Sequence, residues 1–423
     1  MQSSRRLFLR GLASVAGVAS AHTAYAQHVH PTPQPLKAPV QPAGSGPQAA
    51  PHEPGAEVVP VLSPDVPDMP WRLENGVKVF DIRVEHVRTE LIPGRVMDGW
   101  GFNGSIPGPT IQVTEGDRVR LNVENRLPEP FSMHWHGLEI PNEMDGMPGL
   151  SQDAIPPGGR FVYEFTLKQN GTFFYHSHMA MQEMMGLIGL FIIHPRRAYT
   201  PHVDRDFGVI LQEWALLPNN TIPNSLAMEF NWLTLNGKAG PATTPLIVKL
   251  GERVRIRLVN LGMDHHPMHI HGHQFSVTGT EGGRVRTRAV IPENTVLVGV
   301  GQARDIEFVA NNPGDWHFHC HLPHHMMNQM VSMVGPLMMS QANAPRPGST
   351  AAGAPNAGMY PGYPQDMAMV MDDMVAKPET YGLRPGWSGG TMGMMTIVRV
   401  VTPELFDKIQ ALKAEQARKA GGR

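Results

Sequence analysis

The chain has 423 residues, a net charge of -2 with histidine neutral, and only 17% charged residues. This balance provides no basic surface, so nucleic acid is excluded as an expected partner. The 40 prolines and 44 glycines indicate many turns, and hence many short strands. The chain also has 27 methionines, 21 histidines and a single cysteine.

The first residues have the order of an export signal. Arg5 and Arg6 precede a short apolar run, and residues 24–26 (AYA) form a small-x-small cleavage site. The arginine pair resembles the signal of the twin-arginine pathway, which predicts a periplasmic protein that begins near Gln27. The apolar run is shorter than the roughly 20 residues that span a bilayer, so no membrane span is expected.

Composition divides the rest of the chain. After the signal at 1–26, residues 27–67 are rich in Pro and Ala and are expected to be disordered. A similar linker opens the segment 341–423, which continues as a Met-rich tail and ends in a helix with Thr402 as its N-cap and Gly421 past its end. The region between them alternates apolar and polar residues, which is the period of half-buried strands.

This all-β region repeats itself. Residues 109–137 match 245–272, and "GTFFYHSH" at 171–178 matches "GDWHFHCH" at 314–321. Each copy has the size of one Greek-key β-sandwich. The repeat therefore predicts two homologous sandwiches, domain 1 at 68–197 and domain 2 at 198–340, joined near residues 195–205.

Four His-x-His pairs lie at two equivalent places in each repeat. Strand residues i and i+2 share one face, about 6.6 Å apart, so each pair can direct two imidazoles at one site. One pair alone is weak evidence, whereas four at equivalent positions indicate a cluster of copper, zinc, iron or nickel ions. The pairs are His134/His136, His176/His178, His269/His271 and His319/His321.

The only cysteine, Cys320, stands between His319 and His321. Strand alternation directs those two histidines to one face and the thiol to the other, into a second site. His266, His325 and Met330 can complete this site, and one Cys, two His and a distant Met are the ligands of a blue-copper centre. The alternative is a buried structural thiol, which leaves the flanking histidines to chance.

The motifs "HWHG", "HSH", "HPMHIHGH" and "HCHLPHHMMNQM" resemble the four copper motifs of the multicopper oxidases, the laccase family. The resemblance implies two cupredoxin-like domains and four coppers per chain. Type 1 copper is then held by His266, Cys320, His325 and Met330, and type 2 copper by His134 and His269. The type 3 pair is held by His136, His176, His178, His271, His319 and His321.

Aligning the repeats places Phe131, Ser177, Gln182 and Leu187 against His266, Cys320, His325 and Met330. Domain 1 therefore lacks every type 1 ligand. The short segment between the second and third motifs leaves no room for a middle domain, so the chain resembles the two-domain, small laccases. That resemblance implies a homotrimer with each cluster between domain 1 of one subunit and domain 2 of the next.

The resemblance implies oxidation of a phenol or aromatic amine coupled to reduction of O2 to water. Electrons pass through Cys320 and its flanking histidines to the cluster. Asp145 matches a family aspartate that helps deliver protons, while its alternative role is a turn residue before Gly146.

The methionines leave a second substrate class open, because thioethers prefer Cu(I). The Met-rich tail could contact Cu(I) in a copper-tolerance oxidase, or pack as core residues. Met179, Met181, Met184 and Met185 are expected to pack. A copper nitrite reductase and a non-catalytic copper carrier are the weaker alternatives, since domain 1 has Ser177 in place of a type 1 cysteine and all cluster histidines are present.

Overall fold

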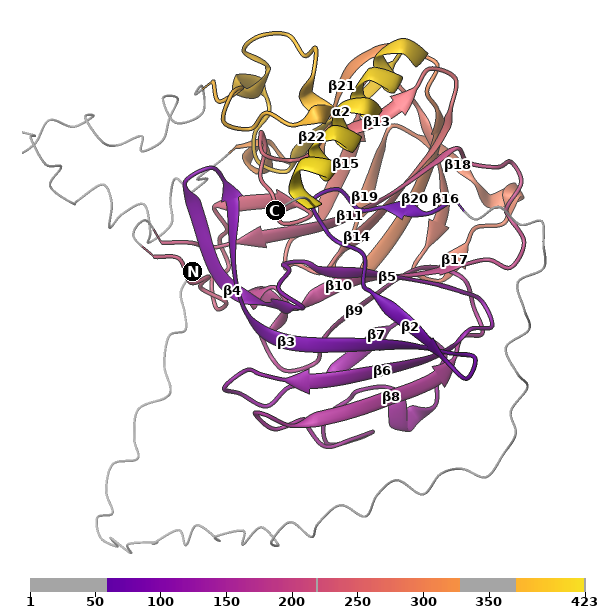
Figure 1. Ribbon diagram of the computed structural model, residues 1–423, viewed down its shortest axis with the longest axis vertical. Helices are drawn as coiled ribbons and strands as arrows, with labels where there is room; N and C mark the ends of the chain where they lie inside the picture. The colour runs from indigo at the N-terminus through magenta and orange to yellow at the C-terminus, as the bar shows by residue number, and fades with distance from the viewer. Residues whose placement is uncertain (1–58, 218–219, 328–369, 422–423) are drawn as a thin grey trace, which may run out of the picture. The chain divides into compact units, whose positions relative to one another are not determined.

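The computed structural model describes residues 59–217, 220–327 and 370–421, which form two β-sandwiches (Figure 1). The expected all-β architecture is confirmed. Each sandwich has its own apolar core, built around Trp135, Tyr163 and Phe191 in domain 1 and around Met268, Phe318 and Val398 in domain 2. The arrangement follows from strand alternation: in β6 (Arg118–Asn125) every second residue is buried.

Domain 1 consists of two sheets. The outer sheet has the order β2-β3-β6-β8, with β4 paired to β3, and the inner sheet has the order β5-β10-β9-β7. The remaining outer strands are β2 (Trp71–Glu74), β3 (Val77–Ile92), β4 (Arg95–Phe102) and β8 (Arg160–Thr166). The inner strands are β5 (Gly108–Thr114), β7 (Met133–His136), β9 (Gly171–Ser177) and β10 (Ile188–His194).

Domain 2 pairs a large sheet with a small one. The large sheet follows β1-β11-β14-β20-β16-β17, with β12 paired to β11 and β18 to β16. Its strands are β1 (Val61–Leu62), β11 (Arg205–Trp214), β12 (Trp232–Leu235), β14 (Arg253–Asn260), β16 (Phe275–Thr280), β17 (Gly283–Arg284), β18 (Ile291–Glu293) and β20 (Gln302–Val309). The small sheet, in the order β13-β22-β21-β15-β19, contains β13 (Leu246–Lys249), β15 (His266–Ile270), β19 (Thr295–Val298), β21 (Gly314–Cys320) and β22 (Met395–Val401).

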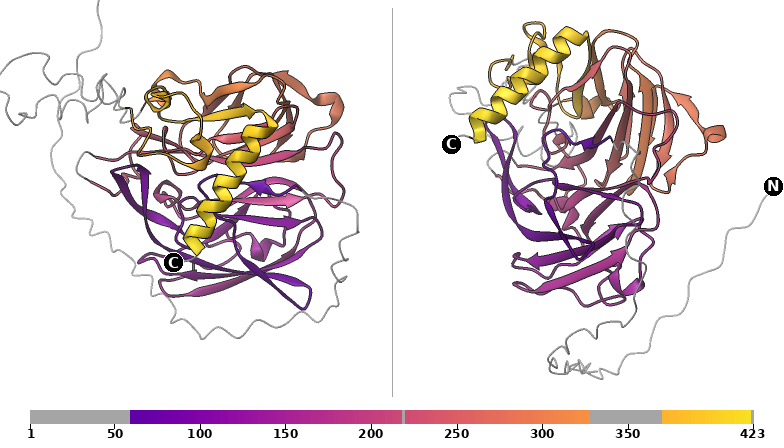
Figure 2. Two further views of the ribbon diagram at one scale, coloured as in Figure 1. Left: turned by 45° about the horizontal axis from the view of Figure 1, so that its top comes forward. Right: turned by 45° about the vertical axis from the view of Figure 1, so that its right-hand side comes forward.

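Short 3-10 helices lie in the loops. They are η1 (Asn142–Met144), η2 (Glu183–Met185), η3 (Thr287–Ala289), η4 (Pro323–Met326), η5 (Pro378–Thr380) and η6 (Trp387–Gly390). The terminal helix α2 (Pro403–Gly421) follows β22, and Figure 2 shows it on the outside of the molecule. Its Phe406 and Ile409 pack on Ile247 of β13. No helix in the described part of the chain has both the length and the apolar character needed to cross a bilayer.

Three expectations about the chain ends need correction. The segment 27–67, expected to be disordered, is ordered from residue 59, because β1 pairs in parallel with β11 and buries Val61. The tail expected after residue 340 contributes β22, which lies between β13 and β21 in the small sheet of domain 2. Helix α2 also includes Gly421, which was expected to follow it. The second sandwich is therefore completed by residues from the far end of the chain.

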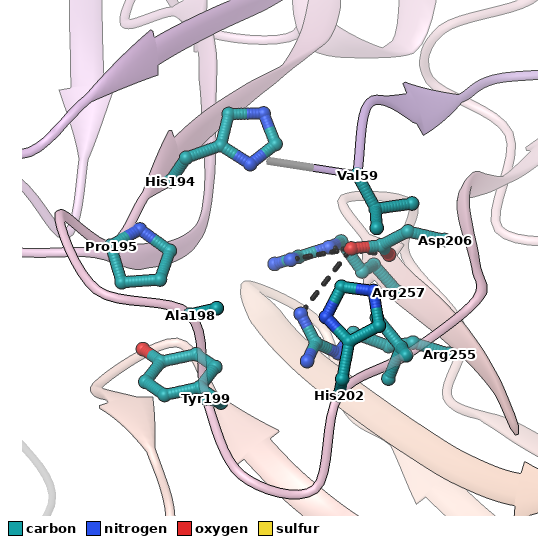
Figure 3. A pocket seen from close by; sticks show the side chains of 10 residues that line it. Val59, His194, Pro195, Ala198, Tyr199, His202, Asp206, Arg255 and Arg257 are labelled. Atoms are coloured by element: carbon teal, nitrogen blue, oxygen red, sulfur yellow. Dashed lines mark hydrogen bonds and ion pairs between the residues drawn. The ribbon is translucent and has the colours of Figure 1, made fainter. Parts of the chain in front are cut away.

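A buried ionic network connects the two sandwiches. Thr172 of β9 donates a hydrogen bond to Asp305 of β20 at 2.6 Å and accepts one from Arg257 at 2.7 Å. Arg257 also forms a bidentate ion pair with Asp206, in which Nε and Nη2 each donate to one carboxylate oxygen at 2.8 Å. Arg257, Asp206 and His194 line a cavity of about 40 Å³. Figure 3 shows these side chains around it. A cavity of this size holds a few waters and no organic substrate.

Candidate metal centres

The first site lies at one end of the small sheet of domain 2. Antiparallel pairing of β15 with β21 places Met268 opposite Cys320, and η4 returns His325 to the same place. The Nδ1 atoms of His266 and His325 are 3.2 Å apart, and Cys320 Sγ is 3.8 Å and 3.4 Å from them. All three side chains are buried. One sulfur and two nitrogens therefore converge on one point.

Carboxylates fix the two imidazole rings of this site. Nε2 of His266 is 3.1 Å from Oε2 of Glu213, and both side chains are fully buried. The backbone N–H of Asp264 donates to Glu213 at 2.9 Å, and that of Met263 also donates to this carboxylate. Nε2 of His325 is 3.6 Å from Asp264, whose pKa is lowered by its hydrogen bond with this ring. Because each Nε2 has an acidic partner, each Nδ1 is directed at the sulfur and available to a metal.

The donor set of this site fits copper. Burial raises the pKa of Cys320 to about 12, so the thiol stays protonated until a bound cation displaces the proton. A thiolate with two imidazoles is the ligand set of blue-copper sites. His265 and His324 do not join it: Nδ1 of His265 accepts the N–H of Val300, and His324 packs its ring on His325. Met330 lies outside the described residues.

The second group of histidines lies on the inner sheet of domain 1. β7 and β9 pair so that His134 is opposite His176. The His134 ring lies 5.7, 5.3 and 5.3 Å from the rings of His136, His176 and His178. Nδ1 of His136 is 3.3 Å from Nε2 of His176. Burial lowers the pKa of His136 to about 4, which keeps this imidazole in the neutral, metal-binding form.

The third group, on domain 2, repeats this arrangement. β15 and β21 pair so that His269 is opposite His319. The His269 ring lies 5.0, 5.6 and 5.4 Å from the rings of His271, His319 and His321. Burial lowers the pKa of His319 to about 4. His269 and His319 are paired across the two strands and therefore share one face, while Cys320, the next residue, is directed to the opposite face.

Backbone carbonyls orient several of these rings. Nδ1 of His176 donates to the carbonyl of Ser177 and Nδ1 of His319 to that of Cys320, both at 2.8 Å. Nδ1 of His269 donates to the carbonyl of Asn294 at 2.6 Å. Each of these contacts leaves Nε2 available, so the rings are held in a ligating tautomer.

One chain does not bring the eight histidines together. Ring contacts and hydrogen bonds among the described residues join the four rings of domain 1 to each other and the four of domain 2 to each other. None of these contacts joins the two groups. Each sandwich thus carries half of the predicted cluster.

Acidic residues lie beside the domain 1 histidines. The Asp145 carbonyl accepts the Nδ1–H of His134 at 2.7 Å, and its carboxylate is 3.6 Å from the same atom. Asp145 also precedes Gly146, where φ is +84° and a side chain would collide with the carbonyl of Met133. Asp145 therefore both precedes the turn at Gly146 and contacts His134, so its two alternative roles do not exclude each other.

Sequence reasoning missed three carboxylates. Glu183 lies 3.2 Å from Nδ1 of His176, and Glu213 and Asp264 hold His266 and His325. Asp264 and Glu183 are near copper motifs in the sequence, which is a signal that could have been used. Glu213 lies on β11, far from any motif, and only its contacts with His266 and with the N–H groups of Met263 and Asp264 identify it.

Comparison with known proteins identifies similar families and structures. Two family models described as multicopper oxidase match residues 84–198 and 216–335, which together exceed half of the chain. A blue copper oxidase from Nitrosomonas europaea has a similar structure, with a TM-score of 0.55 and 34% identity over 59% of this chain and 81% of that one.

Two curated relatives match over shorter parts. A copper resistance protein A homolog of Pseudomonas syringae is 42% identical over 32% of this chain and 23% of its own length. Laccase-2 of Botryotinia fuckeliana is 32% identical over 51% of this chain and 40% of its own. The chain thus covers less than half of either relative. The two matching family models, with the cysteine–histidine site and the repeated histidine groups, show that this chain belongs to the multicopper oxidase family.

Proposed function

We propose that the protein is a copper-dependent oxidase that couples one-electron oxidation of a phenol or aromatic amine to reduction of O2 to water. The observation that carries this proposal is the strand β21, which places Cys320 in a buried thiolate–imidazole site and His319 on the opposite face in a histidine group. A single peptide bond therefore links the two kinds of site. Copper, when bound, would accept electrons one at a time and pass them to dioxygen.

The chain's own residues prepare these sites. Glu213 and Asp264 hold the ring orientations of His266 and His325, and burial excludes water from the thiol. Near the domain 1 histidines, Asp145 is proposed to hold a proton for oxygen reduction, because its carboxylate lies 3.6 Å from His134. Glu183, beside His176, is a second acidic residue in the same region.

The separated histidine groups support a homotrimer with clusters between subunits. Four imidazoles from domain 1 of one copy and four from domain 2 of the next would complete each cluster, and a closed ring needs only one kind of interface. The face of domain 2 that carries His269 also exposes Leu297, at 56%, on the neighbouring edge strand β19.

We also propose that residues 1–26, which lie outside the described part, direct export to the periplasm. The twin arginines Arg5 and Arg6 support this proposal.

Oxidation of Cu(I) is the second candidate, and a methionine cluster favours it. Met184 is buried with Phe230, and Met181 and Met263 pack against them. Met263 precedes Asp264, the partner of His325, so thioethers border the mononuclear site. In the described part of the tail, Met371 and Met395 are buried, which favours packing for them. Met359, Met367 and Met369 lie outside the described residues.

Purification of the copper-loaded protein tests the proposal. We expect an intense blue colour, copper at both kinds of site, and O2 uptake when 2,6-dimethoxyphenol is added. A colourless protein, or one metal ion per chain, contradicts the proposal. Comparing O2 uptake with the phenol and with Cu(I) assigns the substrate class, and a Met181→Leu, Met263→Leu variant that loses only the Cu(I) rate supports the second candidate.

A further inference from the structure

The last strand of domain 2 begins at the mononuclear site. β22 pairs with β21 so that Met395 is opposite His319, and Met394 immediately precedes it. The Cys320 N–H donates to the Met394 carbonyl at 3.0 Å, and the Met394 N–H donates to the His325 carbonyl at 2.9 Å. Met394 is therefore bonded through its backbone to the residues that carry both the thiol and one imidazole.

Domain 1 has the same arrangement, with its strand supplied locally. β10 pairs with β9 so that Ile188 is opposite His176, and the Ser177 N–H donates to the Leu187 carbonyl at 3.1 Å. The Ile188 N–H donates to the Gly186 carbonyl at 2.9 Å, as the Met395 N–H does to that of Gly393 at the same distance.

The two strands also have the same outer neighbours. β10 lies parallel to β5, as β22 lies parallel to β13. Leu187 and Met394 are therefore structurally equivalent. Sequence alignment instead places Met330 against Leu187, because Met330 follows Cys320 at the same spacing as Leu187 follows Ser177.

The Met394 side chain points toward the thiol side of the sheet. Residues paired across strands share a face, so Met395 lies on the face of His319 and the adjacent Met394 on the face of Cys320. Met394 is 0% exposed and belongs to the core cluster that includes Cys320. Gly393 permits this approach: φ is +61°, and a Cβ there would lie 2.3 Å from the His325 carbonyl.

We propose that Met394, rather than Met330, supplies the weak thioether ligand of the Cys320–His266–His325 site. The proposal rests on the proposed function, because it requires copper at that site. Blue-copper sites take a long axial Met bond in addition to one Cys and two His ligands, and the axial ligand tunes the reduction potential. The fourth ligand then comes from the C-terminal segment, separated from His325 by residues 326–393.

Two matched variants of the full-length, copper-loaded protein test this assignment. Leucine conserves the volume of methionine and is tolerated at the equivalent position of domain 1, where Leu187 is buried. Met394→Leu removes a donor that stabilises oxidised copper, so we expect a higher reduction potential and altered visible and electron paramagnetic resonance spectra. Met330→Leu should leave all three unchanged.

A third variant tests the assignment by shifting the reduction potential in the opposite direction. Met394→Gln offers a harder oxygen donor, so we expect a lower reduction potential than in the parent protein. Chemical unfolding of the metal-free variants checks that each one folds.

The results separate the two proposals. A colourless parent protein contradicts the proposed function. A blue parent in which Met330→Leu shifts the potential, or in which Met394→Leu changes neither potential nor spectra, overturns only the ligand assignment.

Discussion

The two sandwiches share a register of strands and histidines, yet of the two only domain 2 has the cysteine and histidines of the proposed mononuclear site. His176 and His319 donate to the following carbonyl at the same distance of 2.8 Å. At the next residue the domains diverge: Cys320 faces two imidazoles, whereas Ser177 donates to Gln182 at 2.7 Å. The histidine group is thus a property of the repeated strand pair, and the proposed mononuclear site depends on the buried side chains on the opposite face.

The buried counterparts in domain 1 are closed to a metal. Phe131 and Leu187 are fully buried and offer no lone pair, and Ser177 and Gln182 satisfy each other. The amide of Gln182 also donates to the carbonyl of Pro130 at 3.0 Å. In domain 1, packed apolar side chains and neutral hydrogen bonds therefore occupy the space that the proposed metal ligands occupy in domain 2.

The largest expected effect comes from making domain 2 resemble domain 1. Cys320→Ser should abolish the blue colour and phenol oxidation, because a hydroxyl does not replace the thiolate as a copper ligand. The histidine groups lie on the other face and should retain their copper. Absorption spectra, copper analysis and O2 uptake check this outcome. Blue colour in the variant would show that the sulfur is not a ligand.

The second prediction concerns the carboxylate behind His266. Domain 1 has the fully buried Phe131, which needs no hydrogen-bond acceptor, where domain 2 has His266 in contact with the fully buried Glu213. Glu213→Ala leaves His266 and the N–H groups of Met263 and Asp264 without this acceptor, so the metal-free protein should lose about 3 kcal/mol of unfolding free energy. Glu213→Gln retains an oxygen and should lose less. Urea unfolding measures both, and equal stability of the Ala variant and the parent would refute this account.

The third prediction uses the ends of the equivalent strands. β10 ends at His194 beside Arg257, and β22 ends at Val401. Burial, aided by the charge of Arg257, lowers the pKa of His194 from 6.5 to about 4. Between these values the unfolded chain binds more protons, so unfolding free energy should rise with pH over this window by up to about 3 kcal/mol from this residue.

His194→Val, which copies domain 2, should remove that contribution. The readout is the difference between variant and parent in the pH slope of unfolding free energy for the metal-free protein. This difference cancels the titration of the other histidines. Parallel slopes in the two proteins would show that His194 is not the residue responsible.

The sequence predicts these sites to the extent that they depend on local pattern. The internal repeat predicts both sandwiches. The alternation of side chains around Cys320 predicts the two faces of β21, because successive residues of a strand point to opposite faces whichever strand it pairs with. β22 could not be predicted to join domain 2, because its pairing with β13 and β21 bridges residues far apart in the chain. Glu213 was missed for the same reason: its contact with His266 spans two strands that no motif links.

The smallest expected effect tests whether the domain 1 residues themselves exclude a metal. Ser177→Ala removes one hydrogen bond to Gln182 and should cost about 1 kcal/mol of unfolding free energy. Ser177→Cys places a thiol at the position equivalent to Cys320, but Phe131 and Gln182 provide no imidazole, so no second blue band should form. Copper titration of this variant, followed by absorption, measures the outcome. A second blue band would mean that the thiol alone recruits copper, and that the absence of Cys, rather than of His, separates the two sandwiches.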